Sequence, residues 1–313
     1  MFAAMWNQVW PWIAFGALVA VMLTLDLAFF HRSGVHRSTR ASAAWSALFV
    51  GVGLSFAVIV GLSRGTDAAF QYLTAFLIEE SLSVDNLFVF LALFTYFGVP
   101  RDYQHRVLFW GIVGAIVMRG VFITAGVALI HAFHWLIYVL GVLLIATGAK
   151  LGLGKGEEVH PERNRLVRWA SRVLPMDRAY HGDHFTVRRD GRLLFTPLML
   201  VLLAVESTDV MFAVDSVPAV LAVSQDVFVV YSSNVFAVIG LRAIYSLLSG
   251  ALGALRFLRP ALALILMLVG AKMLLSGVVE VPTQLSLVVV GAILAGATAV
   301  SLLSPERPAG PGE

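Results

Sequence analysis

The chain has 313 residues, of which 59% are hydrophobic and 13% are charged, with a formal net charge of +3 and a mean hydropathy of +0.86. Soluble domains are about 45–50% apolar and about 25% charged, so this composition excludes a soluble fold of this size. The apolar runs continue over about 20 residues without alternating at a period of two, which favours membrane-spanning helices over a transmembrane β-barrel. The chain has no cysteine, which excludes disulfides and thiolate-based metal or redox chemistry.

The hydropathy pattern predicts an all-α polytopic membrane protein with nine transmembrane helices. The first apolar run has no basic residue before it and no evident cleavage site after it, so we expect a retained helix rather than a signal peptide. Trp6, Trp10 and Trp12 suit its anchoring at a membrane interface. The nine expected spans are residues 11–30, 43–62, 69–98, 107–130, 132–150, 195–223, 227–249, 257–277 and 283–303.

The basic residues are distributed unevenly between the loops that alternate along the chain. With the N-terminus outside, 17 of the 22 Lys and Arg residues fall in inner segments, and Arg64 alone falls in an outer one. The remaining four lie in spans or at their ends. Because cytoplasmic loops carry the excess of basic residues, the expected topology is N-terminus outside and C-terminus inside.

The longest loop, residues 151–194, is basic and is expected on the cytoplasmic side. Within it, the segment Arg163–Leu174 places Leu166, Trp169 and Val173 at helical intervals, with arginines on the other side. This pattern fits an amphipathic helix that lies on the inner leaflet. A merely solvated basic loop stays open as the alternative.

The second part of the same loop is expected to form a short hairpin. Asp190-Gly191 is a favourable turn between the flanking segments 185–189 and 192–195. Three polar side chains just before the hairpin offer an alternative metal site, although such residues in a loop are more often solvated. They are His181, Asp183 and His184.

The third to fifth spans and the sixth to eighth spans carry matching residues in the same order. Glu80-Ser81 recurs as Glu206-Ser207, and a single arginine recurs in the following span as Arg119 and Arg242. A unit of three spans must invert when it is repeated, so we expect two inverted three-helix repeats, a transporter architecture with a site near the midplane. The expected division is one membrane domain over residues 1–313, with repeat one at 69–150, the cytoplasmic loop at 151–194, repeat two at 195–277 and a disordered tail at 304–313.

Seven acidic residues fall within the expected spans. Each costs about 2.5–3.5 kcal/mol at a helix centre on insertion scales, so these side chains must line a polar interior, pair with bases or bind cations. Glu80 lies about 16 Å into its span at 1.5 Å per residue, near the middle of the hydrocarbon core, and Glu206 lies at the same depth from the other side. The seven are Asp26, Glu79, Glu80, Asp85, Glu206, Asp209 and Asp215.

Helical spacing groups some of these acids in the sixth span. Glu206 and Asp209 are three residues apart and share a face, whereas Asp215 would point to the opposite side of a regular helix. Pro218 cannot donate a hydrogen bond to the Val214 carbonyl, so it is expected to kink or unwind the helix there. That distortion would turn Asp215 inward and free a carbonyl as a ligand.

The acids of the third span are not aligned either. Glu80 and Asp85 are about 140° apart around a regular helix. A local break near Ser81–Ser83 would aim both at one ion, and discontinuous helices are common at transporter sites.

Buried ion pairs with Arg119, Arg242 and Lys272 are the structural alternative for these acids. Three or four bases cannot neutralise seven acids, so the surplus negative charge suits a divalent cation, with Asn86 and Asn234 as neutral oxygen donors. The candidate ligands are oxygen atoms, with no cysteine in the chain and no histidine deep within an expected span. Such a ligand set favours Mn²⁺, Ca²⁺ or Mg²⁺ over Zn²⁺ or Cu⁺. No bound organic cofactor is expected.

The segments that carry these acids resemble the TerC family of integral membrane proteins, named for tellurium resistance and including the Alx type. The resemblance rests on EESLSVDNLFVF at Glu79–Phe90, on ESTDVMFAVDSVPA at Glu206–Ala219, and on YHGDHF and RDGRL in the cytoplasmic loop. It implies a multi-pass protein of the bacterial inner membrane, with family members linked to Mn²⁺ export. The metal-site residues that it implies are Glu80, Asp85, Asn86, Glu206, Asp209 and Asp215. Independently of the resemblance, the supporting or ion-pairing residues expected from the spans themselves are Glu79, Arg119, Asn234, Arg242, Lys272 and Asp26. Asp26 lies near the inner end of its span, so extension of its side chain toward water stays open as the alternative.

The leading hypothesis is a Mn²⁺ exporter that works by alternating access of the two repeats, with proton antiport through the same carboxylates. Its expected partners are the lipid bilayer, a divalent cation and protons, without nucleic acid, and the oligomeric state stays open. The alternative is a non-transporting membrane scaffold or tellurite-resistance factor that acts through the basic cytoplasmic loop. An enzyme is not expected, because the sequence shows no nucleophile–base constellation and no phosphate-binding loop.

Overall fold

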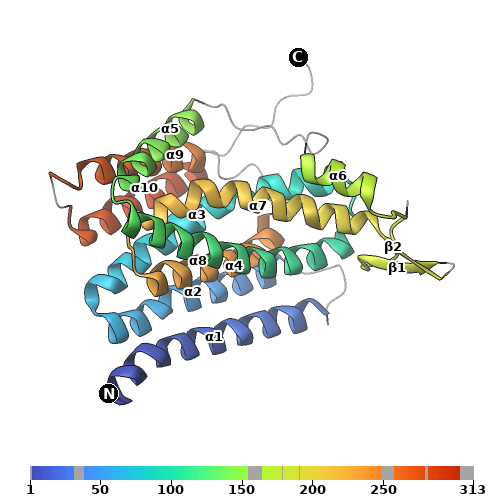
Figure 1. Ribbon diagram of the computed structural model, residues 1–313, viewed down its shortest axis with the longest axis horizontal. Coiled ribbons are helices and arrows are strands. Elements are labelled where there is room, and N and C mark those ends of the chain that lie inside the picture. The colour runs from blue at the N-terminus through green and yellow to red at the C-terminus, as the bar shows by residue number, and fades with distance from the viewer. Residues whose placement is uncertain are drawn as a thin grey trace.

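The computed structural model describes residues 2–31, 39–153, 164–177, 179–189, 191–248, 257–278 and 281–303. These residues form helices and one short hairpin (Figure 1), and each of the nine expected spans falls on one helix. The elements are α1 Phe2–His31, α2 Thr39–Arg64, α3 Thr66–Tyr96, α4 Arg101–Ala132, α5 Leu136–Gly152, α6 Arg165–Val173, β1 Thr186–Arg189, β2 Arg192–Phe195, α7 Pro197–Leu221, α8 Val227–Leu248, α9 Leu258–Leu275 and α10 Thr283–Leu303.

Six of these helices are long and apolar enough to cross a membrane, which supports a polytopic membrane protein. Residues 136–152 of α5 and 227–241 of α8 are apolar but shorter. α3 is long, but its apolar sequence is interrupted by Glu79, Glu80 and Asp85. Membrane crossing by α3, α5 and α8, and the topology itself, stay predictions. The six segments are 9–28, 41–64, 101–132, 197–221, 258–275 and 283–301.

α3 and α8 lie at the centre of the helical bundle. α3 packs against α2, α7, α8, α9 and α10, and α4 packs against both α7 and α8. α1 lies along one side of the bundle against α2 and α8 (Figure 1). The interior at the junction of α3, α4, α7 and α8 is therefore the part of the molecule most enclosed by other helices.

α5 and α9 approach each other at backbone contact. A Cβ atom at Gly270 would lie 2.6 Å from the Gly141 carbonyl oxygen, and one at Gly148 would lie 2.7 Å from the Ala263 carbonyl oxygen. Small residues permit such approach between membrane helices. The α5–α9 pair is consequently a tight unit beside the central junction.

The predicted amphipathic helix and the predicted hairpin are both present in the segment between α5 and α7. α6 packs against α7, and β1 pairs antiparallel with β2 from Thr186↔Phe195 to Arg189↔Arg192. Gly191 adopts a positive φ of 75° in the turn, which glycine allows without steric cost. The expected disordered tail, residues 304–313, lies outside the described residues.

The predicted break near Ser81–Ser83 is wrong, because α3 is helical throughout this segment. The Ser81 hydroxyl donates to the Leu77 carbonyl at 2.6 Å, so it adds a bond within the helix instead of interrupting it. α7 likewise stays helical through Pro218, and the Ala222 amide donates to the Pro218 carbonyl at 3.0 Å. The predicted unwinding at Pro218 is therefore not present either.

Candidate cation site

Arg119 of α4 is fully buried and contacts side chains from three other helices. Its Nη1 donates to Glu79 Oε1 of α3 and, at 2.6 Å, to Asn234 Oδ1 of α8. Its Nη2 lies 3.4 Å from Asp209 Oδ1 of α7, and Asn234 Nδ2 donates to Glu79 Oε2 at 3.0 Å. We call these four residues the Arg119 cluster. It joins the four helices of the central junction through charge-assisted hydrogen bonds.

The acids around Arg119 outnumber this single base among the described side chains. Asp209 Oδ2 and both Glu80 carboxylate oxygens are buried without a hydrogen-bond partner, and Glu206 lies one turn before Asp209 on α7. A buried carboxylate without a partner is costly, because it loses its hydration and gains nothing in return. Such a group is satisfied by a cation or by a proton.

Two glycines bring the glutamates against neighbouring helices. A Cβ atom at Gly240 of α8 would lie 3.1 Å from Glu80 Oε1. A Cβ atom at Gly114 of α4 would overlap the Glu206 carboxylate. At Gly114, only a residue without a side chain permits the observed position of the Glu206 carboxylate. An added Cβ at Gly240 would require the Glu80 carboxylate to shift by a few tenths of an ångström.

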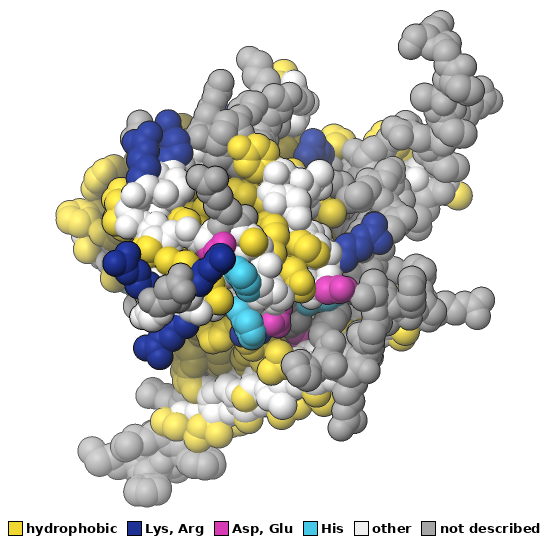
Figure 2. Space-filling view, turned by 90° about the vertical axis from the view of Figure 1, so that its right-hand side faces the viewer, with side chains coloured by type: hydrophobic (Ala, Val, Ile, Leu, Met, Phe, Trp, Pro, Cys, Tyr) yellow, Lys and Arg dark blue, Asp and Glu magenta, His cyan; other side chains and the backbone are white. Residues whose placement is uncertain are grey.

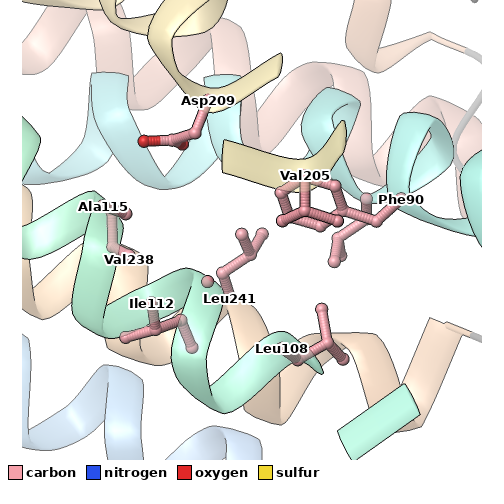
Figure 3. A pocket seen from close by; sticks show the side chains of 10 residues that line it. Phe90, Leu108, Ile112, Ala115, Val205, Asp209, Val238 and Leu241 are labelled. Atoms are coloured by element: carbon pink, nitrogen blue, oxygen red, sulfur yellow. The ribbon is translucent and has the colours of Figure 1, made fainter. Parts of the chain in front are cut away.

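A small cavity adjoins the Arg119 cluster between α3, α4, α7 and α8 (Figure 3). Asp209 lies at one end, and apolar side chains surround the rest (Figure 3). Water-molecule centres have about 20 Å³ of space in it, enough for one or two waters by the usual requirement of about 10–15 Å³ each. The lining residues are Leu87, Phe90, Leu108, Gly111, Ile112, Ala115, Val205, Asp209, Val238 and Leu241.

Several candidates from the sequence lie away from this cluster. Thr147 of α5 donates to Asp215 at 3.3 Å, so Asp215 faces α5 and not Arg119. Lys272 donates to Ser286 of α10 at 2.9 Å. Asp26 is buried in α1, and α1 packs only on the side of the bundle.

The remaining candidates are on α3 and α8. Asn86 is buried and lies seven residues after Glu79, on the same face of α3. The side chains of Asp85 and Arg242 lie outside the described residues. Among the side chains that the structure does describe, no three of His, Asp or Glu converge to hold a metal ion. The six-residue ligand set is therefore not assembled in the described part of the chain.

Sequence reasoning grouped Glu79 with Arg119 as an alternative to metal binding, and the structure shows this ion pair. It missed Gly114 and Gly240. The available signal was glycine within an apolar span, which indicates close approach of another element.

At the hairpin end, the three polar loop residues divide between separate contacts. His181 Nε2 lies 3.0 Å from Asp177 Oδ2, whereas Arg106 donates to Asp183 at 2.6 Å and His184 lies 3.7 Å from Asp183. The hydrogen bond from Arg106 lowers the pKa of Asp183 below its ordinary value. Figure 2 shows this end of the molecule, where histidines and acids are surrounded by Lys and Arg side chains.

Comparison with known proteins identifies the family. The profile of the "Integral membrane protein TerC family" matches residues 64–308. An uncharacterized membrane protein of Myxococcus xanthus is 44% identical over 292 residues, covering 93% of this chain and 92% of its own. The Escherichia coli K12 protein named "Putative membrane-bound redox modulator Alx" is also 44% identical over 292 residues, covering 90% and 91%.

A membrane protein of Rickettsia felis is 36% identical over 278 residues, covering 89% of this chain and 92% of its own. No solved structure gives a significant match. The profile match covers most of the chain, including α3, α4, α7 and α8, which form the central junction. The chain therefore belongs to the TerC family of integral membrane proteins.

Proposed function

We propose that this protein exports a divalent cation, Mn²⁺ in the first place, across the bacterial inner membrane by alternating access. Ca²⁺ and Mg²⁺ are the alternative cargoes. The observation that carries the proposal is the excess of acid over described base at the central junction. Arg119 contacts both Glu79 and Asp209. Glu80 and Glu206 lie in the same junction against Gly240 of α8 and Gly114 of α4. Carboxylate and amide oxygens are ligands that these hard cations prefer.

The contacts of the central junction support an inverted repeat. Glu80 and Glu206 are 126 residues apart, and so are Gly114 and Gly240. Glu80 of α3 faces Gly240 of α8, while Glu206 of α7 faces Gly114 of α4. The pairing of α3 with α8 is thus mirrored by the pairing of α7 with α4, as two repeats related by a twofold axis would produce.

The same geometry supports a site that exchanges occupants. Arg119 contacts Glu79 from repeat one and both Asp209 and Asn234 from repeat two. An entering cation would take over the carboxylates that Arg119 or a proton neutralises in its absence. A relative rotation of the repeats would then open the site to the other side of the membrane.

Export of a divalent cation needs an energy source. Moving charge against an inside-negative potential costs about 2.3 kcal/mol per charge per 100 mV, or about 4.6 kcal/mol for two charges. Exchange for protons at the same carboxylates would supply this energy, because protons that enter the cell move down their electrochemical gradient while the cation moves up its own.

Transport by the reconstituted protein tests the proposal. Mn²⁺ uptake into inside-out proteoliposomes is measured for the wild type, for Asp209→Asn and for Asp102→Asn, whose carboxylate is exposed in the first turn of α4. We expect Asp102→Asn to transport normally and Asp209→Asn to lose most of the activity. Equal rates for all three would contradict the site, and no uptake by the wild type above protein-free liposomes would contradict the function.

A further inference from the structure

α6 lies antiparallel along the first part of α7. At its start, Asn164 Nδ2 donates to Ser207 Oγ at 2.6 Å. Just beyond its end, the Phe195 amide donates to the Pro175 carbonyl at 2.8 Å, two residues before α7 begins. Ser207 is ten residues into α7, which corresponds to about 15 Å at 1.5 Å per residue. α6 therefore accompanies α7 over this length, as Figure 1 shows.

The apolar length of α7 and the charged hairpin before it define the membrane depth of the Asn164–Ser207 contact. Residues 197–221 are long and apolar enough to cross a membrane. Arg188, Arg189 and Arg192 are exposed on the hairpin immediately before α7, where their charges require water or lipid headgroups. The start of α7 thus marks the inner interface, and Ser207 lies near the middle of a hydrocarbon core about 30 Å thick. α6 consequently occupies the depth of the inner leaflet instead of resting on its surface.

The two sides of α6 differ in what they contact. Val167 and Ala170 are buried in the protein. Leu166, Trp169 and Val173, spaced three and four residues apart, form an adjoining strip and are 39%, 58% and 59% exposed. Acyl chains are the surroundings that favourably cover apolar side chains at this depth and exposure.

A second strip of α6 is cationic. Arg168 and Arg172 are exposed and lie four residues apart, so they follow one another along the helix beside the apolar strip. Arginine binds phosphate through paired N–H donors, and the long side chain can reach the headgroup region from within the leaflet. Two arginines on one lipid-facing helix match the charge of anionic phospholipids.

We propose that α6 is a lipid-binding half-membrane helix, with Leu166, Trp169 and Val173 in contact with acyl chains and with Arg168 and Arg172 bound to the phosphates of anionic lipids of the inner leaflet. The Asn164–Ser207 hydrogen bond holds the deep end of this helix in place beside Glu206. The site is independent of which cargo the protein carries.

Site-directed spin labelling tests the depth of α6. The chain has no cysteine, so a single cysteine in Trp169→Cys or Val173→Cys carries the label in vesicles that contain phosphatidylglycerol. The controls are Val58→Cys, 65% exposed on the predicted membrane span α2, and Leu193→Cys, 52% exposed on β2. Power saturation compares collision of the label with oxygen, which concentrates in the bilayer, and with a water-soluble nickel chelate.

The proposal expects labels at 169 and 173 to resemble the label at 58, with oxygen access several-fold above nickel access. Nickel access equal to that at 193 for both α6 positions would overturn it. The lipid phosphates are tested by native mass spectrometry of the full protein, where wild type is expected to retain more phosphatidylglycerol than phosphatidylcholine. Equal retention by wild type and by the Arg168→Gln/Arg172→Gln variant would overturn the assignment of the two arginines.

Discussion

The carboxylate of Glu206 lies so close to Gly114 that a Cβ atom at position 114 would overlap it. Glu206 is carried by α7 and Gly114 by α4, so this contact joins the two predicted repeats. The acid reaches this position only because the facing helix has no side chain there. The position of the carboxylate is therefore determined by α4 as much as by α7.

Gly114→Ala is expected to displace the Glu206 carboxylate and to impair Mn²⁺ transport. Overpacking of this kind typically costs about 1–3 kcal/mol of stability, and displacement of a proposed cation ligand would in addition reduce the transport rate. Gly16→Ala is the matched control, because no atom lies within 4 Å of its added Cβ. Transport at the wild-type rate by Gly114→Ala would show that the position of Glu206 does not matter.

Arg119→Gln is expected to destabilise the protein strongly. Removing one partner of a buried ion pair typically costs about 3–5 kcal/mol, because the other charge stays buried without compensation. The control is Arg64→Gln, since Arg64 lies 3.7 Å from Asp226 with both side chains about one-third exposed, and such pairs contribute about 0–1 kcal/mol. The measurement is thermal unfolding in detergent. A similar small loss of Tm for both variants would contradict the structural role of Arg119.

The Arg106–Asp183 contact predicts a pH dependence at the hairpin end. Because the hydrogen bond from Arg106 lowers the pKa of Asp183 below its ordinary 3.8, the contact stabilises the fold at neutral pH and is lost as the pH falls through the lowered pKa. The Tm difference between wild type and Asp183→Asn should therefore stay constant down to about pH 5 and vanish only below 3.8. A difference that already fades between about pH 7 and pH 6 would contradict this dependence, because the lowered pKa keeps Asp183 ionised in that range.

Replacing Glu206 or the hairpin arginines separates transport from a scaffold role. Transport through the central junction predicts that Glu206→Gln lowers the tolerance of cells to excess Mn²⁺, while the triple variant of Arg188, Arg189 and Arg192 to Gln stays close to wild type. A scaffold that acts through the basic loop predicts the reverse. Growth in graded Mn²⁺, with equal amounts of each variant in the membrane, distinguishes the two outcomes.

The helices could be predicted closely from the sequence because apolar runs and their charged ends are local features. The expected segment 195–223 became α7, Pro197–Leu221, and the turn signal at Asp190-Gly191 identified the hairpin. The position of α6 beside the middle of α7 could not be predicted. It depends on the hydrogen bond between Asn164 and Ser207, residues 43 positions apart.

The candidate site was predicted in part. The spacing of Glu206 and Asp209 placed both correctly toward one face, since helical periodicity is local. The predicted break near Ser81–Ser83 was wrong, because it assumed that Glu80 and Asp85 both reach one ion, whereas α3 is continuous. In the structure Arg119 links Asp209 to Glu79, whereas Asp215 accepts a hydrogen bond from Thr147. This arrangement depends on the packing of several helices, so the spacing of residues along one helix could not predict it.

The central claim, a divalent cation held by the buried acids of α3 and α7, is tested most directly by anomalous diffraction from Mn²⁺-soaked crystals. The account predicts a manganese peak within about 2.6 Å of a carboxylate oxygen of Asp209 or Glu206. A single peak at the hairpin end near His181 and Asp183, with no density at the central junction under saturating Mn²⁺, would contradict it.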